Sequence, residues 1–121
     1  MSDQKIIIPN AGICQVAVSI IEEGAPVRWI MRKKPVEKDD TGWLFQTELE
    51  HPEHAPAGTY AMIDYNWMCR IDPVAIAVWD FPTGCELAVN HDYHGRFELI
   101  DTFTDRVVPP ELFYTPPKYS R

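Results

Sequence analysis

Two histidine pairs carry the side chains of this 121-residue chain that are best suited to chemistry. The segments His51-Pro52-Glu53-His54 and His91-Asp92-Tyr93-His94 each combine two imidazoles with a carboxylate, and these groups are common ligands of zinc and other divalent metals. A spacing of three suits one ion best on a helix, whereas the first pair spans a proline and the second is expected in a hairpin loop. Surface histidines are therefore the main interpretation. The alternative is a metal-binding protein or metal-dependent enzyme that uses four ligands: His51, His54, His91 and His94.

Three cysteines are the other candidate reactive groups. Cys14, Cys69 and Cys85 are odd in number, widely spaced and set among apolar residues. This pattern favours reduced, structural thiols with a raised pKa over a disulfide framework, a zinc site or a nucleophile. The chain also has no glycine-rich phosphate loop and no Gly-x-Ser-x-Gly motif. The sequence therefore predicts no catalytic residue and no cofactor.

Composition excludes several classes of protein. With 45% hydrophobic and 12% aromatic residues, the chain is expected to fold as one globular domain over residues 1–121. Its 11 Lys and Arg against 18 Asp and Glu give a net charge of −7, which disfavours nucleic acid as a partner. Ile6–Ile8 is too short for a secretory signal, and no apolar stretch approaches the ~20 residues that span a bilayer. We expect a cytoplasmic protein that binds no membrane.

The elements that position these groups follow from hydrophobic periodicity, which predicts an α+β domain. We expect about five mainly antiparallel strands and one or two short helices. A β-branched strand over 13–21 is expected to form a hairpin with a strand over 27–32, in which Val27, Trp29 and Met31 face the core. Residues 33–42 then form a charged loop.

Gly42 and Trp43 mark the end of that loop. Gly42 is expected to supply a positive φ, and Trp43 to start the third strand with its ring in the core. Asp40 is expected to accept a backbone N–H one or two residues further on, in an Asx-type turn. The next segment, over 48–58, is predicted to be a polar loop.

Short elements are predicted in the second half of the chain. They are a strand over 59–63, a helical turn over 64–70 that carries Trp67 and Met68 into the core, and a helix over 74–79. Asp72 and Pro73 begin that last helix as its cap and first residue. Trp79, like Trp29 and Trp67, is expected in the core.

A second hairpin and an arm complete the chain. A turn at Gly84 leads into a hairpin of strands over 85–89 and 96–103. The proline-rich arm over 107–121 is expected to contain one helical turn after Pro110. We expect this arm to fold back over a sheet edge rather than clasp a partner.

Two clusters of residues are similar to a known family. The first reads Arg-Lys-Lys-Pro at 32–35 and Asp-Thr-Gly-Trp-Leu-Phe at 40–45, and the second reads Ile-Asp-Pro-Val at 71–74 and Pro-Thr-Gly at 82–84. Over about residues 11–90 the chain resembles a bacterial immunity-protein-like family, the immunity protein thirty-three type, formerly a domain of unknown function. Thr41 stands where that family usually has Ser.

The resemblance implies a non-catalytic interaction protein that binds and neutralises a cognate toxin. Candidate partner contacts lie in two predicted loops: Glu37, Asp39, Asp40 and Tyr93. The net charge predicts a partner with a basic surface. A structural role is expected for the other motif residues, which are Gly42, Trp43, Asp72, Pro73 and Gly84. A generic regulatory binding module unrelated to toxins is the remaining alternative.

Overall fold

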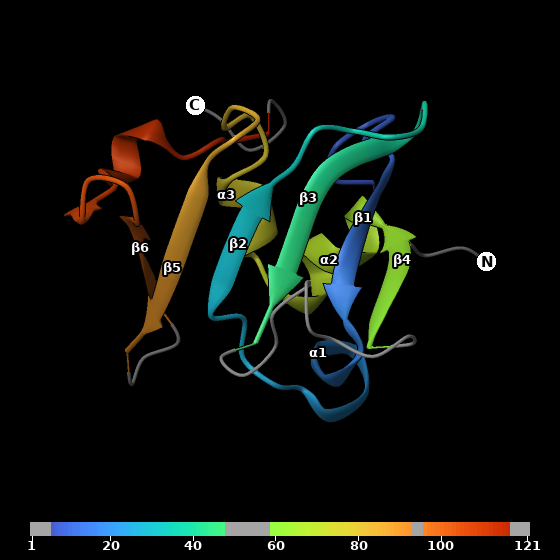
Figure 1. The fold of residues 1–121 in the computed structure, drawn as a ribbon, viewed down its shortest axis with the longest axis horizontal. Helices are drawn as coiled ribbons and strands as arrows, with labels where there is room; N and C mark the ends of the chain where they lie inside the picture. The colour runs from blue at the N-terminus through green and yellow to red at the C-terminus, as the bar shows by residue number, and fades with distance from the viewer. Residues whose placement is uncertain (1–5, 48–58, 93–95, 117–121) are drawn as a thin grey trace.

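A single mixed β-sheet organises the molecule. The computed structural model describes residues 6–47, 59–92 and 96–116. Within them the sheet has seven strands in the order β4-β1-β3-β2-β5-β6-β7 (Figure 1). The strands are β1 Ile13–Ala17, β2 Trp29–Arg32, β3 Asp40–Gln46, β4 Tyr60–Asp64, β5 Glu86–His91, β6 Phe97–Asp101 and β7 Arg106–Val107. The helices are α1 Val18–Glu23, α2 Tyr65–Ile71, α3 Val74–Ala77 and the 3₁₀ turn η1 Pro110–Leu112.

The α+β class is as predicted, but the sheet is larger and less regular than expected. It has seven strands among the described residues rather than about five, and it is mixed because β1 runs parallel to β3. The predicted hairpin between the first two strands is wrong. β3 lies between β1 and β2, and β1 pairs instead with β3 and with β4. The chain leaves β1 through α1, and this crossover allows the parallel pairing.

The predicted strand over 13–21 is also wrong in its second half. β1 ends at Ala17, and residues 18–23 form α1, which places Ile20 in the core at 2% exposure. Gly24 ends the helix with a φ of 68°, and the amide of Ala25 donates to the carbonyl of Ser19. Packing of one apolar face and a left-handed glycine cap together override the β-propensity of Val18 and Ile20.

The core lies between the sheet and the helices α2 and α3, which cover its rear face in Figure 1. In β2 the core face is the opposite of the one predicted. Ile30 is fully buried between its neighbours Phe45 and Leu87, whereas Trp29 is 37% exposed. Successive side chains of a strand point to opposite faces of the sheet, so a prediction that is wrong by one residue exchanges the two faces.

The helical region confirms most of the prediction around Asp72, with two corrections. Met68 is buried, but Trp67 is exposed because the helical spacing of α2 turns Tyr65, Met68 and Cys69 inward instead. The helix predicted over 74–79 ends as α3 at Ala77, and tighter turns carry the chain on. Trp79 is half-buried, and its ring lies 5.0 Å from that of Tyr65.

The second hairpin is confirmed, and the arm folds back. β5 pairs with β6 from Leu87–Asp101 to His91–Phe97. Beyond β7, the amide of Tyr114 donates to the carbonyl of Ala77 at 2.9 Å, and Phe113 stacks on Phe97 with 5.7 Å between ring centres. The predicted helical turn after Pro110 is η1. The predicted loop over 48–58 and the end of the arm at 117–121 lie outside the described residues.

No helix in the described parts of the chain combines the length and the apolar character needed to cross a membrane.

Candidate partner-binding site

The loop between β2 and β3 is held in one conformation by Asp40. Its Oδ1 accepts the amide of Gly42 at 2.8 Å, which is the predicted Asx-type turn, and its Oδ2 accepts the amide of Val36 at 3.1 Å. The amide of Asp40 donates to the carbonyl of Glu37 at 3.1 Å. Both oxygens of the Asp40 carboxylate therefore hold the loop in shape.

The residues that this turn presents to solvent are Val36, Glu37, Lys38 and Asp39. Val36 is 84% exposed, so this loop presents one apolar side chain among its charged residues. Asp39 is fixed through its backbone, since its carbonyl accepts the amide of Ile13 at 2.8 Å. Asp39 also lines a pocket of about 400 Å³ whose wall includes Arg70. The loop is thus a rigid projection with an apolar tip beside two carboxylates.

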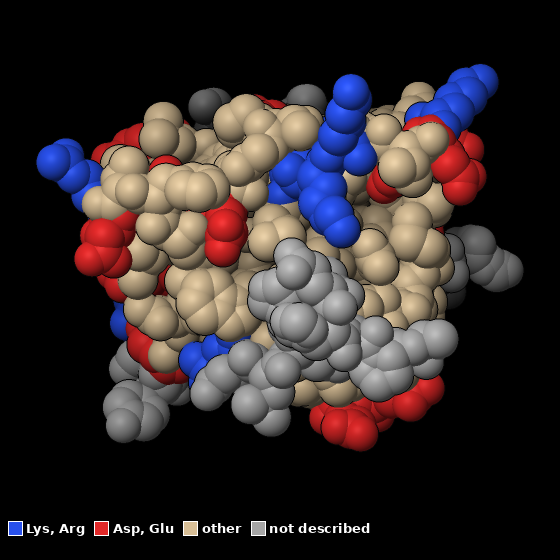
Figure 2. All heavy atoms as spheres, viewed as in Figure 1, with Lys and Arg blue, Asp and Glu red and all other residues tan. Residues whose placement is uncertain are grey.

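The charge of this loop is mixed. Lys33, Lys34 and Lys38 balance Glu37, Asp39 and Asp40 along residues 33–40. Blue and red spheres accordingly lie side by side at the upper right of the molecule in Figure 2. Any attraction to a basic partner at this loop depends on where the individual carboxylates lie, because the loop has no net charge of its own.

Arg32 joins the two sequence clusters in space. Its Nε donates to the carbonyl of Thr41 at 2.9 Å, and its Nη1 donates to the carbonyl of Phe81 at 2.7 Å. Its own carbonyl accepts the amide of Gly84 at 2.7 Å. One residue at the end of β2 therefore connects the start of β3 with the turn between α3 and β5.

Gly42 and Trp43 form the buried base of the loop. Gly42 has a φ of 84°, and an added Cβ there would collide with the carbonyl oxygen of Lys33. Trp43 is 1% exposed, and its ring centre lies 6.3 Å from that of Phe45. The indole Nε1 of Trp43 has no hydrogen-bond partner within the described ranges. Both residues shape and support the loop from inside.

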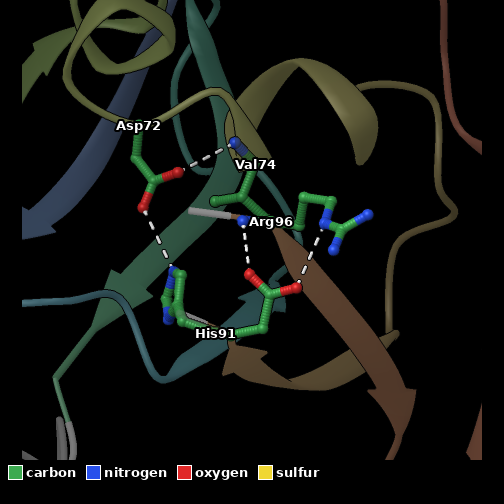
Figure 3. Close-up of polar contacts among 5 residues, drawn as sticks. Asp72, Val74, His91 and Arg96 are labelled. Carbon is green, nitrogen blue, oxygen red and sulfur yellow. Dashed lines mark hydrogen bonds and ion pairs between the residues drawn. The ribbon is translucent and has the colours of Figure 1, made fainter. Parts of the chain in front are cut away.

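Asp72 organises the second cluster and also contacts His91. Its Oδ1 accepts the amide of Val74 at 3.0 Å, so it caps the first turn of α3, while its Oδ2 lies 3.9 Å from His91 Nε2 (Figure 3). Pro73 lies between Asp72 and Val74 at the start of α3. Gly84, in the turn that leads into β5, has a φ of 98°. The contact connects the far end of β5 to the helix start.

Only one of the four proposed metal ligands, His91, lies among the described residues. His91 faces Asp72, and the neighbouring Asp92 is engaged with Arg96 through the 3.1 Å contact drawn in Figure 3. No group of three or more His, Cys, Asp or Glu side chains suited to a metal ion occurs in 6–47, 59–92 or 96–116. Four residues named from the sequence lie outside these ranges: His51, His54, His94 and the candidate contact Tyr93.

The three cysteines are free thiols placed as predicted. Cys14 and Cys69 are buried, and Cys85 is half-buried. Removal from water raises the pKa of all three, in the case of Cys69 to about 12. A thiol with such a pKa stays protonated at neutral pH, so these side chains act as small apolar groups.

Sequence reasoning missed Arg32, which it placed on the wet face of its strand. Arg32 is two residues after Ile30 and therefore on the same face of the strand, directly before the Lys-Lys-Pro segment, and this position was the signal in the sequence. It also did not anticipate Val36, because a single apolar residue within a charged loop has no periodic partner.

A family model described as the Immunity protein Imm33 domain matches residues 14–100, well over half of the chain. The chain belongs to the Imm33 immunity protein family. The matched range contains Arg32, the β2–β3 loop, the Asp72 cap and the turn at Gly84, and it ends inside β6. No curated protein and no solved structure is significantly similar to the chain.

Proposed function

We propose that this Imm33 protein is a bacterial immunity protein that binds a cognate toxin and neutralises it by occupying its surface, without chemistry of its own. Family membership over residues 14–100 is the observation that carries this proposal. The proposal places the protein in the cytoplasm, where the toxin would act on the cell that produces it.

The β2–β3 loop is the contact that we propose within the family region. Protein interfaces form readily around preorganised projections, because little conformational entropy is lost on binding. The bonds made by Asp40 supply that rigidity, and Val36 supplies an apolar tip. Glu37 and Asp39 beside it favour a toxin with a basic surface, which a protein acting on an anionic substrate would have.

The experiment pairs the protein with the toxin encoded in the neighbouring reading frame. Co-expression should restore growth of cells that produce the toxin, and the two purified proteins should form a stable complex by calorimetry and size-exclusion chromatography. Asp40→Asn places an NH2 group where one of the two carboxylate oxygens accepts a loop amide, so it should loosen the loop and weaken the complex. Continued growth arrest together with the absence of a complex would contradict the proposal.

A second measurement separates binding from chemistry. Toxin that is separated from the complex in denaturant and refolded alone should be active, because an immunity protein that only covers its surface leaves the toxin unmodified. Mass spectrometry of the recovered toxin should show its unaltered mass. A modified or cleaved toxin would identify an enzyme instead.

A further inference from the structure

A pocket of about 600 Å³ lies at the same end of the sheet as the β2–β3 loop, but toward the opposite edge (Figure 1). It is an open pocket lined by the turn between α3 and β5, by the β6–β7 turn and by the folded-back arm with η1, drawn in red in Figure 1. Most of its lining is apolar, including Phe81, Val107, Val108 and Leu112. This volume falls in the range of small-molecule and side-chain sites, about 300–1,000 Å³.

The rim of the pocket exposes large apolar side chains. Val107 and Leu112, which line the pocket, are 51% and 62% exposed. Phe103 does not line it but lies next to the lining residue Thr104 in the β6–β7 turn, and it is 71% exposed. Isolated apolar residues on a surface are ordinary, whereas several around one apolar hollow mark an interaction site. Much of this wall comes from residues beyond 100, outside the range that the family model matches.

The fixed charge of the pocket is negative. Asp80 and Asp101 line it together with Arg106. Asp101 is half-buried, and its Oδ1 accepts the amide of Phe103 at 2.9 Å, so its carboxylate is held in place. Arg106 is exposed on the two-residue strand β7, directly opposite Asp101 in the β6–β7 pairing, so the pocket carries one cation against two carboxylates.

We propose that this pocket binds a segment of the toxin that carries an arginine or lysine next to an apolar residue. The inference rests on the proposed function for the identity of the partner. The aliphatic stem and the apolar neighbour pack against Phe81, Val107 and Leu112, while the cationic end reaches Asp101 and Asp80. Two carboxylates against one cation favour this occupant over an acidic segment.

The chemistry of the pocket is tested first without the toxin. Butylguanidinium imitates an arginine side chain, and pentanoate has a similar stem with the opposite charge. In NMR titrations of the full-length protein, we expect butylguanidinium to shift the methyl signals of Val107 and Leu112 and pentanoate to leave them unchanged. Equal shifts with both probes, or larger shifts with pentanoate, would overturn the proposed charge preference.

Two isosteric variants locate the effect. Asp101→Asn keeps an oxygen that accepts the amide of Phe103, and it should weaken butylguanidinium binding several-fold. Asp105→Asn removes an equal charge from the same turn at a residue that does not line the pocket, and it should bind as the wild type does. Asn also tolerates the positive φ of 59° at this position. Equal weakening by both variants would overturn the assignment to Asp101.

Measurements of toxin binding then test whether the toxin is what occupies the pocket. Leu112→Ala and Asp101→Asn should each raise the Kd for the toxin about tenfold, which corresponds to ~1.4 kcal/mol, while Asp105→Asn leaves it unchanged. If the wild type binds the toxin and these variants bind it equally well, this inference fails and the proposed function stands. If the wild type does not bind the toxin, both fail, whatever the small probes do. Self-association that Leu112→Ala abolishes would make a second copy the occupant and would also overturn the inference.

Discussion

The guanidinium carbon of Arg32 lies 5.2 Å from the centre of the Trp43 ring. The same group donates to the carbonyls of Thr41 and Phe81, so the cation is held by one aromatic face and two backbone oxygens. Cation–π contact and hydrogen bonding compensate for its partial removal from water. Because the three partners come from β3 and from the turn after α3, the stability of the binding loop depends on this residue.

Arg32→Met should therefore lower the free energy of unfolding by about 1–3 kcal/mol, since it leaves two enclosed carbonyls without their donors. Urea denaturation followed by tryptophan fluorescence measures the change. Lys33→Met is the matched control, because it removes an equal charge from the next, exposed residue and should cost less than about 0.5 kcal/mol. Equal losses in the two variants would contradict the bracing role of Arg32.

Trp43 is expected to contribute more than any contact at the loop surface. Trp43→Ala should destabilise the fold by about 3–5 kcal/mol, because it empties a large volume in the core. Trp43→Phe should cost clearly less, since it retains a packed ring and removes an indole N–H that is unpaired within the described residues. Thermal denaturation orders the variants. If both melt like the wild type but lose the toxin, Trp43 is a contact residue and the structural assignment is wrong.

Alanine variants of Gly42 and Gly24 distinguish the cost of a steric collision from the cost of backbone strain. Both have a positive φ, but only at Gly42 would a Cβ meet another backbone, at the carbonyl of Lys33. Gly24→Ala should cost about 1–2 kcal/mol, the usual penalty of the left-handed conformation for an L-residue. Gly42→Ala should cost more, and Gly42→Val more again. Chemical denaturation of the three variants measures the order, and equal costs for the two alanine variants would refute the proposed close contact.

The parts of the fold that the sequence predicted are those determined by local chemistry. Asp40 and Gly42 define a turn through bonds across two residues, and Asp72 and Pro73 define a helix start in the same way. The β5–β6 hairpin is likewise a local pairing. The order of the strands depends on distant contacts: nothing within residues 13–32 indicates that β3 separates β1 from β2.

The choice of which face of β2 is buried shows a second limit of prediction from the sequence. Val27, Trp29 and Met31 are all apolar, but so is Ile30, so the alternation is consistent with either face. The buried neighbours Phe45 and Leu87 decide in favour of Ile30. The same limit applies to the binding surface. The loop was recognisable from one segment, whereas the 600 Å³ pocket combines residues from 80 to 112 that only the folded arm brings together.

Alkaline pH should destabilise the protein through its buried acids. Burial raises the pKa of Cys69 from 9.0 to about 12, and it also raises those of Cys14 and Tyr65. The unfolded chain loses these protons first, so stability is complete below pH ~9 and falls as the pH rises toward 12. Each such thiol contributes a slope of about 1.4 kcal/mol per pH unit.

Urea denaturation between pH 7 and pH 11 measures this slope. Cys69→Ala should make it shallower, because one of the groups responsible is gone. Val74→Ala truncates another buried side chain without removing a titrating group, so it should lower stability equally at every pH. A slope that Cys69→Ala leaves unchanged would contradict the assignment.

The binding loop is expected to act mainly on the rate of association. Glu37 and Asp39 are exposed, whereas Asp40 is occupied by the amides of Val36 and Gly42, so a charge-reversal test must leave Asp40 in place. The double variant Glu37→Lys/Asp39→Lys changes the net charge by four units. It should slow association with the toxin and flatten the dependence of that rate on ionic strength, because complementary charges chiefly accelerate encounter. Dissociation should change less, since the desolvated centre of an interface determines most of the affinity.

The matched control reverses the same number of charges at the other end of the sheet. Glu22 and Glu23 are exposed at the end of α1, which follows the far end of β1. Glu22→Lys/Glu23→Lys therefore produces an equal change in net charge at a site remote from the loop. Stopped-flow association at several salt concentrations, with melting temperatures for both variants, compares the two positions. If both variants slow association equally, the overall charge of −7 steers the encounter and the loop has no special part in it. If neither does, Glu37 and Asp39 do not attract the toxin, and the proposed electrostatic role of the β2–β3 loop is refuted.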